Sequence, residues 1–265
     1  MPDPQRGIMS KPNPSDPCHP RTRACLHEAL RSLPQGGSPL IQIVKRAERG
    51  IQNKKRGVLG VLPASFNPPT SAHQALVKEA GEAVPFDEIL LILDRQAMDK
   101  ELLGASLEDR LLMLLALFGD DPHISLGISN RGLFLEKVEA MRKVYPRRHT
   151  QIYFIVGYDT IVRVLDHKYY GDRSKALRSL FSQARFLVAN REGCEVRDLT
   201  ELFGLEENRA FAARVSPLTL PAEQAWISSS EVRRRLAERK SVRGLVPPKL
   251  EELLLKRGFY GRHDP

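Results

Sequence analysis

Two short stretches of the sequence combine hydroxyl, imidazole and guanidinium groups at spacings that suit the binding of phosphate. The first runs from Gly60 to His73 and reads GVLPASFNPPTSAH. It continues a short apolar run, so we expect a strand to end and a helix to begin there, which presents backbone N–H groups and the positive end of a helix to one small volume. Thr70 and His73 would project to the same side of that helix, where both could bind phosphate oxygens. A proline-rich turn capped by Thr70, with His73 on the surface, is the simpler alternative.

The second stretch runs from Ile227 to Leu236 and reads ISSSEVRRRL. Its serines open a predicted helix, and Glu231 follows Ser228 at the spacing of a capping box. The serine hydroxyls, the backbone N–H groups at the start of the helix and Arg233 one turn later could form a second phosphate site. Each stretch alone has a structural explanation, as a capped turn or a capped helix. Their presence in one domain favours phosphate binding.

The elements that must position these residues alternate between strand and helix. Apolar runs predict strands at 58–62, 88–93, 123–129, 151–157 and 185–190. Helical periodicity lies between them, over 71–82, 106–118 and 132–145. Apolar strands in this alternation predict an α/β fold with a doubly wound, mostly parallel sheet covered on both faces, and with a helical C-terminal part. Such a sheet binds its ligands at the carboxyl ends of the strands.

The start of the chain differs from the rest in composition. Residues 1–56 hold eleven Lys and Arg against four Asp and Glu, whereas the remainder holds 30 against 28, so most of the net charge of +9 lies near the N-terminus. We predict a flexible basic leader over residues 1–37 and one α/β domain over 38–265. The apolar cluster Leu40, Ile41, Ile43 and Val44 is expected to dock onto the domain as a helix.

Composition narrows the classes of function. The chain is 42% hydrophobic and 28% charged, has a mean hydropathy of −0.33, and has no apolar stretch long enough for a membrane span. Three cysteines without a close pair predict a cytoplasmic location, and the cysteines and histidines lack the spacing of a zinc site. The chain contains no recognised nucleic-acid module, so small molecules rather than nucleic acid are the expected partners.

The first stretch resembles the phosphate-binding signature of the nucleotidyltransferase superfamily, in which G-x-F-N-P is followed by H/T-x-x-H. The second resembles the late I-S-S-T-x-I-R signature of the same family, with Ser230 and Val232 at the threonine and isoleucine positions. Gly157 and Asp159, after the fourth predicted strand, are similar to the family's G-x-D. The resemblance covers about residues 57–261 and is nearest to the nicotinamide and nicotinate mononucleotide adenylyltransferases.

This resemblance implies a Rossmann-like nucleotidyltransferase domain that transfers AMP from ATP to a mononucleotide, as in NAD biosynthesis. It implies that a dinucleotide forms, that pyrophosphate leaves, and that Mg²⁺ is held on the ATP phosphates rather than by protein ligands. The catalytic contacts would come from Thr70, His73 and Arg233. The implied ATP-binding residues are Ser65, Phe66, Gly157, Asp159, Ser228, Ser229 and Ser230.

The implied acceptor site departs from the family pattern. Its expected residues are Lys100, Lys168, Tyr169 and Tyr170. The sequence DHKYY at 166–170 stands where bacterial members place a tryptophan, and this pattern is closer to an adenylyltransferase-like branch found in fungi. Either tyrosine could stack on the ring of the acceptor, or the pair could simply pack in the core.

A second departure lies in the first stretch, where Pro63 and Ala64 replace a glycine pair. The two departures keep two alternatives open. One is a nucleotidyltransferase with another phosphorylated acceptor, and the other is an ATP-binding or ATPase homologue that has lost transfer activity. The sequence does not decide between an amide and an acid acceptor, and it leaves a homo-oligomer open.

Overall fold

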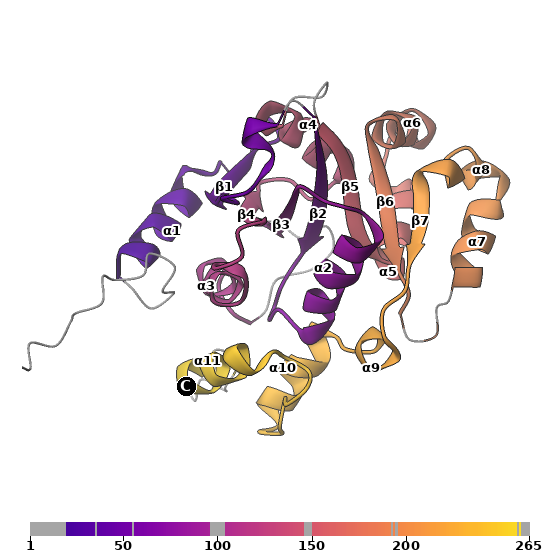
Figure 1. Ribbon diagram of the computed structural model, residues 1–265. Helices are drawn as coiled ribbons and strands as arrows, with labels where there is room; N and C mark the ends of the chain where they lie inside the picture. Colours follow the sequence, from indigo (N-terminus) through magenta and orange to yellow (C-terminus); the bar gives the residue numbers. More distant parts are fainter. Residues whose placement is uncertain are drawn as a thin grey trace, which may run out of the picture.

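The computed structural model describes residues 20–34, 36–54, 56–95, 104–145, 150–191, 193, 196–258 and 260 (Figure 1). Its strands are β1 Ile41–Lys45, β2 Gly57–Ala64, β3 Glu88–Asp94, β4 Ile124–Ser129, β5 Thr150–Gly157, β6 Ala184–Ala189 and β7 Val215–Leu218. Its helices are α1 Pro20–Ser32, α2 Ser71–Ala83, α3 Leu107–Phe118, α4 Phe134–Val144, α5 Tyr158–Leu165, α6 Arg173–Gln183, α7 Val196–Gly204, α8 Glu206–Arg209, α9 Ala222–Ala225, α10 Ser229–Ala237 and α11 Pro248–Arg257. None of the described helices is long and apolar enough to cross a membrane.

The strands form one sheet in the order β1-β4-β3-β2-β5-β6-β7. All neighbours are parallel except β1, which runs antiparallel to β4. The chain proceeds outward from β2 through β3 to β4, and then outward on the other side from β5 through β6 to β7. The carboxyl ends of β2 and β5 therefore flank a topological switch point, where sheets of this class bind their ligands.

Side chains alternate between the two faces of the sheet and meet a different set of helices on each. Leu90 and Ile92 of β3 belong to a buried cluster with residues of α4, α5, α6 and α7. Leu91 and Leu93 belong to a second cluster with residues of α1, α2, α3 and α9. Helices α10 and α11 form a third cluster with residues of α2 and α3, and they lie below these helices in Figure 1. Both faces are thus covered, as the predicted fold class requires.

The predicted α/β fold is confirmed, including the five strands and the helices between them. Ser106 caps α3 as its sequence position indicates, because its hydroxyl accepts the N–H of Asp109 at 3.0 Å. Strand β7 was not predicted. It is a four-residue edge strand that contains Pro217, and it lacks the continuous apolar run that identified the other parallel strands.

The prediction of a helix over the cluster at residues 40–44 is wrong, because these residues form β1. Ile41, Ile43 and Val44 are β-branched, and such side chains fit a pleated strand better than a helix. Pairing with β4 also covers what would otherwise be an exposed sheet edge.

Residues 20–34 differ from the expected flexible leader. Helix α1 packs against α3, and Leu26 within it and Leu33 directly after it are only 3% and 1% exposed. The guanidinium of Arg95 donates to the carbonyls of Leu30 and Leu33 and so ties the end of this segment to the end of β3. The basic composition of this segment led us to predict a flexible leader, because composition does not show that the helix has an apolar face. Residues 1–19 lie outside the described part of the chain.

Candidate active site

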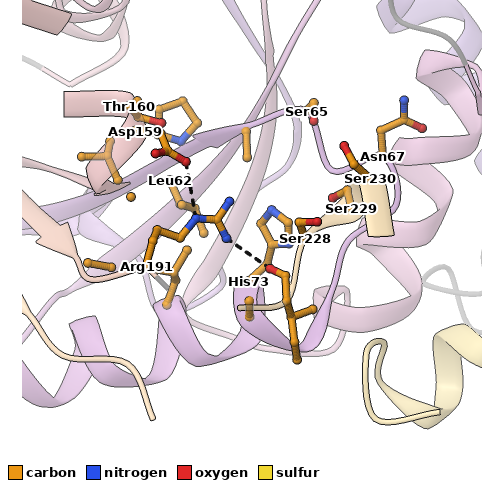
Figure 2. A pocket seen from close by; sticks show the side chains of 18 of the residues that line it. Leu62, Ser65, Asn67, His73, Asp159, Thr160, Arg191, Ser228, Ser229 and Ser230 are labelled. Atoms are coloured by element: carbon orange, nitrogen blue, oxygen red, sulfur yellow. Dashed lines mark hydrogen bonds and ion pairs between the residues drawn. The ribbon is translucent and has the colours of Figure 1, made fainter. Parts of the chain in front are cut away.

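A pocket of about 460 Å³ opens at the carboxyl ends of the central strands, at the switch point (Figure 2). Residues that follow four of the parallel strands line it, with Ser65 and Asn67 after β2, Gly132 after β4, Asp159 after β5 and Arg191 after β6. The last residue of β3, Asp94, also lines it, as do residues 227–230 at the start of α10. Both predicted phosphate-binding stretches therefore meet at one pocket.

Thr70 and His73 form a fixed pair at the start of α2. Thr70 is the N-cap residue and is fully buried, and its backbone N–H donates to Nδ1 of His73 at 3.0 Å. The Thr70 hydroxyl lies 2.8 Å from the same nitrogen. A ring nitrogen that accepts an N–H carries a lone pair, so the proton of the neutral imidazole is on Nε2. Thr70 thus orients the ring, while His73 itself lines the pocket.

Burial, reinforced by the nearby positive charge of Arg191, lowers the pKa of His73 from 6.5 to about 4. The imidazole is therefore neutral at pH 7 and offers Nε2–H as an uncharged donor. A bound polyphosphate would favour the protonated ring and raise this pKa again.

The loop between Thr70 and β2 holds an unusual backbone conformation. Phe66 has a φ of 43°, in the left-handed region that bulky residues rarely adopt. Its ring is fully buried, with its centroid 4.9 Å from that of His73. The carbonyl of the preceding residue, Ser65, accepts from buried Arg110 at 3.3 Å. Strained backbone held by buried contacts is typical of functional sites.

The proline at the end of β2 is accommodated by the strand pairing. Pro63 and Ala64 pair with Ile92 and Leu93 of β3, whereas the pairing of β2 with β5 ends at Val61. The position therefore tolerates a residue without a backbone N–H. Both Pro63 and Ala64 line the pocket, so the replacement of the family's glycines changes the wall of the site rather than the fold.

The start of α10 is bonded directly to the first stretch. The hydroxyl of Ser229 donates to the carbonyl of Pro68 at 2.8 Å, and Nη1 of Arg233 donates to the carbonyl of Asn67 at 2.6 Å. The hydroxyl of Tyr260, near the end of the chain, donates to the side-chain oxygen of Asn67 at 2.8 Å. The two stretches therefore form one continuous structure, although about 160 residues separate them.

The three serines of the second stretch are not equivalent. Ser228 accepts the N–H of Glu231 at 3.1 Å as the N-cap of α10, which confirms this half of the expected capping box, whereas the carboxylate of Glu231 accepts from Arg234 and Arg235. Ser230 accepts from Nη2 of Arg233 at 3.1 Å. A hydroxyl that accepts keeps its own hydrogen for another partner, whereas Ser229 already donates to Pro68. Ser228 and Ser230 are therefore the better hydroxyl donors toward a ligand in the pocket.

Arg191 is a residue that we did not predict. It follows β6, and its guanidinium spans the pocket between Asp159 and the start of α10 (Figure 2). Its Nε lies 3.7 Å from a carboxylate oxygen of Asp159, and its Nη1 donates to the carbonyl of Ile227 at 3.1 Å. A cation directly after a parallel strand was the signal available in the sequence. Gly157, the N-cap residue of α5, and Asp159 line the same part of the pocket.

Of the expected acceptor residues that the structure describes, Lys168, Tyr169 and Tyr170 do not line the pocket. Tyr170 packs against the core, and its hydroxyl donates to the carbonyl of Val164 at 2.7 Å. The ammonium of Lys168 lies 3.6 Å from Asp166 and 4.7 Å from the centre of the Tyr169 ring. These residues follow the far end of α5, whereas the pocket lies at its beginning. Lys100 lies outside the described residues.

Four further residues that we did not predict also line the pocket. They are Asp94, Gly132, Phe134 and, from the second turn of α5, Arg163. Within the described ranges, no three His, Cys, Asp or Glu side chains are grouped so that they could hold a metal ion. The groups around His73 and α10 are hydroxyls, an imidazole and guanidiniums, which suit phosphate oxygens.

Comparisons with known proteins agree with this architecture. A nicotinic acid mononucleotide adenylyltransferase from Plasmodium falciparum, in complex with NaAD, superposes with a TM-score of 0.58 over 77% of this chain and 98% of its own, at 17% identity. The same enzyme in complex with APC gives 0.57 at 16% identity. These similarities show the fold.

Sequence relatives show the family. The probable nicotinate-nucleotide adenylyltransferase of Gemmatimonas aurantiaca is 30% identical over 207 residues, which cover 76% of this chain and 92% of the relative. A putative nicotinamide mononucleotide adenylyltransferase of Schizosaccharomyces pombe is 33% identical over 137 residues, or 50% of this chain and 53% of the relative. The cytidylyltransferase-like family model matches residues 61–235, which include both predicted phosphate-binding stretches except Gly60 and Leu236 at their outer ends. The chain therefore belongs to the cytidylyltransferase-like family of nucleotidyltransferases.

Proposed function

We propose that the protein is an adenylyltransferase that joins the AMP part of ATP to the phosphate of a pyridine mononucleotide and releases pyrophosphate. The observation that carries this proposal is the direct bonding of α10 to the loop after β2, which places the groups of two phosphate-binding stretches around one end of a single pocket. The relatives named as nicotinate and nicotinamide adenylyltransferases support the choice of a pyridine mononucleotide. The product would belong to NAD biosynthesis, and the cytoplasmic location stays a prediction.

The ATP would lie at the end of the pocket formed by α2, α10 and the loop after β6. Backbone N–H groups at Ser65 and Phe66, together with the hydroxyls of Ser228 and Ser230, would bind the phosphates. Asp159 is exposed at the start of α5, where its carboxylate could accept the ribose hydroxyls. Binding of the ribose there would displace Arg191 from Asp159 and free its guanidinium for the phosphates.

The transfer needs charge stabilisation rather than a general base. An oxygen of the acceptor phosphate attacks the α-phosphorus of ATP in line, and the bond from that phosphorus to the bridging oxygen breaks, so pyrophosphate departs with the electron pair. The nucleophile is already an anion, and no proton has to be removed. Nε2–H of His73 would donate to an oxygen on the α-phosphate, while Arg233 and Arg191 would neutralise the departing pyrophosphate. Mg²⁺ bound to the ATP phosphates would supply further charge neutralisation.

The roles of Thr70 and Ser229 follow from their bonds. Thr70 holds the imidazole, and Ser229 holds the loop at Pro68, so both position the groups that touch the substrate. Arg233 combines both roles, because it donates to Asn67 and lines the pocket.

The test is to incubate the protein with Mg-ATP and a panel of mononucleotides that includes nicotinamide, nicotinate and cytidine mononucleotides. We expect a pyridine dinucleotide, detected by mass, in an amount equal to the pyrophosphate released. Formation of a dinucleotide only from a non-pyridine acceptor would agree with nucleotidyl transfer but would contradict the proposal that the acceptor is a pyridine mononucleotide. Hydrolysis of ATP to ADP without any dinucleotide would overturn the proposed transfer.

A further inference from the structure

A buried ion pair forms part of the acceptor side of the pocket. The ammonium of Lys137, on α4, lies 3.0 Å from Oδ1 of Asp94 at the carboxyl end of β3. The same ammonium donates to the carbonyl of Gly132 and lies 5.4 Å from the centre of the Phe134 ring. Asp94, Gly132 and Phe134 all line the pocket, whereas Lys137 does not.

The two charges of this pair are presented unequally to the pocket. The side chain of Lys137 is 0% exposed and that of Asp94 is 20% exposed. Oδ1 of Asp94 is itself buried, so a ligand can meet the remaining part of the Asp94 side chain but not the ammonium. The Gly132 carbonyl, which could otherwise accept from a ligand, is already bonded to Lys137. The pair therefore acts as a dipole whose negative end faces the pocket. Burial raises the pKa of Asp94 to about 6, against the opposing effect of Lys137, and the group is still mainly ionised at neutral pH.

A carboxylate in this position distinguishes the two pyridine mononucleotides. A carboxamide carries two N–H donors, whereas a carboxylate only accepts hydrogen bonds and bears a negative charge. Asp94 can accept from the amide and repels the acid, and juxtaposed like charges strongly disfavour a wrong partner. We propose that Asp94 selects an acceptor with a carboxamide over one with a carboxylate. This inference rests on the proposed function, because it assumes that the acceptor is a pyridine mononucleotide.

A second charged side chain could favour the opposite choice. Arg163 is exposed and lines the pocket from α5, and a guanidinium there could bind a carboxylate. Asp94 forms the end of a strand and is held by a buried partner, whereas Arg163 is on a helix and its side chain is exposed to solvent. Rigidly held groups discriminate better than exposed long side chains, because less conformational freedom is lost on binding. The geometry therefore favours Asp94 as the determinant.

The experiment measures kcat/KM for nicotinamide mononucleotide and nicotinate mononucleotide on the full-length protein with Mg-ATP. We expect the wild type to prefer the amide by about tenfold or more. Asp94→Asn replaces the carboxylate by a group that can also donate to an acid, so the preference should fall by about tenfold, mainly through a gain on nicotinate mononucleotide.

Two further variants separate selectivity from folding. Asp94→Asn leaves the ammonium of Lys137 buried without its counter-charge, so the double variant Asp94→Asn/Lys137→Met removes both charges and should show the same loss of preference. Asp87→Asn is the matched control. Asp87 pairs with Lys54 at the opposite end of β3, and its loss should leave the ratio of the two kcat/KM values unchanged.

Three outcomes of these measurements would contradict the role of Asp94. A wild type that prefers nicotinate mononucleotide, and that loses this preference in Arg163→Gln, assigns the choice to Arg163 and overturns the inference about Asp94. Equal use of both acceptors, or an unchanged ratio in both Asp94 variants, also overturns it while the proposed function stands. Turnover of neither mononucleotide by the wild type overturns the proposed function and this inference together.

Discussion

The backbone N–H of Thr70 and Nδ1 of His73, 3.0 Å apart, together decide which nitrogen of the imidazole can act on a substrate. Because Nδ1 accepts this hydrogen bond, Nε2 carries the proton, and the ring is a neutral donor. The capping interaction and the proposed catalytic role are therefore two consequences of one geometry. The simpler alternative is correct in that Thr70 caps α2, but His73 lines the pocket rather than lying on the open surface.

Replacement of His73 by alanine is expected to reduce turnover much more than ATP affinity. Ground-state ATP would be held by Arg233, Arg191 and backbone N–H groups, whereas charge develops near Nε2–H during transfer. Loss of such a donor typically costs about 10²–10³ in kcat. Steady-state kinetics at saturating ATP and a separate Kd for a non-hydrolysable analogue measure the two effects. Near-normal kcat in His73→Ala would show that His73 has no catalytic role.

Thr70→Ala should have a milder effect than His73→Ala, because the backbone N–H that orients the ring remains. Only the hydroxyl at 2.8 Å from Nδ1 is lost. We expect a fall in kcat of about fivefold, the size of one net hydrogen bond of about 1 kcal/mol. Thr70→Ser keeps the hydroxyl and is the control. A loss in Thr70→Ala equal to that in His73→Ala would mean that Thr70 itself contacts the phosphates.

The pH dependence of stability should reveal His73 and Asp94 as opposing groups. His73 has a folded pKa of about 4, below its ordinary 6.5, so the unfolded state binds more protons in this window and stability is lost as pH falls through it. Asp94 has a folded pKa of about 6, above its ordinary 3.8, so its contribution is present at low pH and is lost as pH rises toward 6.

The free energy of unfolding of each variant is compared with that of the wild type between pH 4 and pH 6.5. Asp94→Asn should lose stability more steeply as pH falls, and His73→Ala less steeply. Denaturant titrations at several pH values measure both effects. The contributions of the other carboxylates are common to all the proteins and cancel when the variants are compared with the wild type. Parallel curves for the wild type and His73→Ala would contradict the lowered pKa of His73.

Arg191→Met is expected to weaken the binding of Mg-ATP by about tenfold or more, the cost of a lost charge-assisted hydrogen bond. Arg185→Met removes a cation from β6 itself, away from the pocket, and should leave the affinity unchanged. Calorimetric titration with a non-hydrolysable ATP analogue provides both values. Equal affinities for wild type and Arg191→Met would show that Arg191 does not bind ATP and serves only in its contacts with Asp159 and Ile227.

Removal of residues 1–37 is expected to destabilise the protein, unlike removal of residues 1–19. The longer truncation deletes Leu26 and Leu33, and burial of each leucine contributes about 1.5–3 kcal/mol. It also leaves a hydrophobic surface of α3 uncovered. Thermal denaturation of both truncations and of the Leu26→Ala/Leu33→Ala variant tests this. Identical midpoints for the two truncations would support the original prediction that residues 1–37 do not contribute to the stability of the domain.

Sequence reasoning succeeded where local signals and the fold agree. The buried strands β2 to β6 are mainly apolar, and the two predicted phosphate-binding stretches run into helices whose starts Thr70 and Ser228 cap. It failed at β1, which we expected as a helix, and at the docking of α1, whose helical spacing is visible in the sequence but whose packing against α3 is not. A free edge on β4 makes a strand of residues 41–45, and an apolar face of α3 makes a docked helix of residues 20–32.

The acceptor side of the pocket could not be derived for a different reason. Tyr169 and Tyr170 have the chemistry to stack on a ring, but they lie beyond the far end of α5, where Tyr170 packs against the core and Tyr169 lies beside Lys168. Asp94 is the last residue of an apolar run, and nothing near it in the sequence indicates its pairing with Lys137. Such pairings across elements depend on the register of the sheet and the placement of α4.

The most direct test of AMP transfer follows the oxygen atoms. The protein is incubated with Mg-ATP and a pyridine mononucleotide whose phosphate oxygens carry ¹⁸O, and the products are analysed by mass. If an oxygen of the acceptor phosphate attacks the α-phosphorus, the dinucleotide retains all of the label and an equal amount of pyrophosphate carries none. Label in the pyrophosphate, or ADP and inorganic phosphate without a dinucleotide, would contradict the proposed reaction.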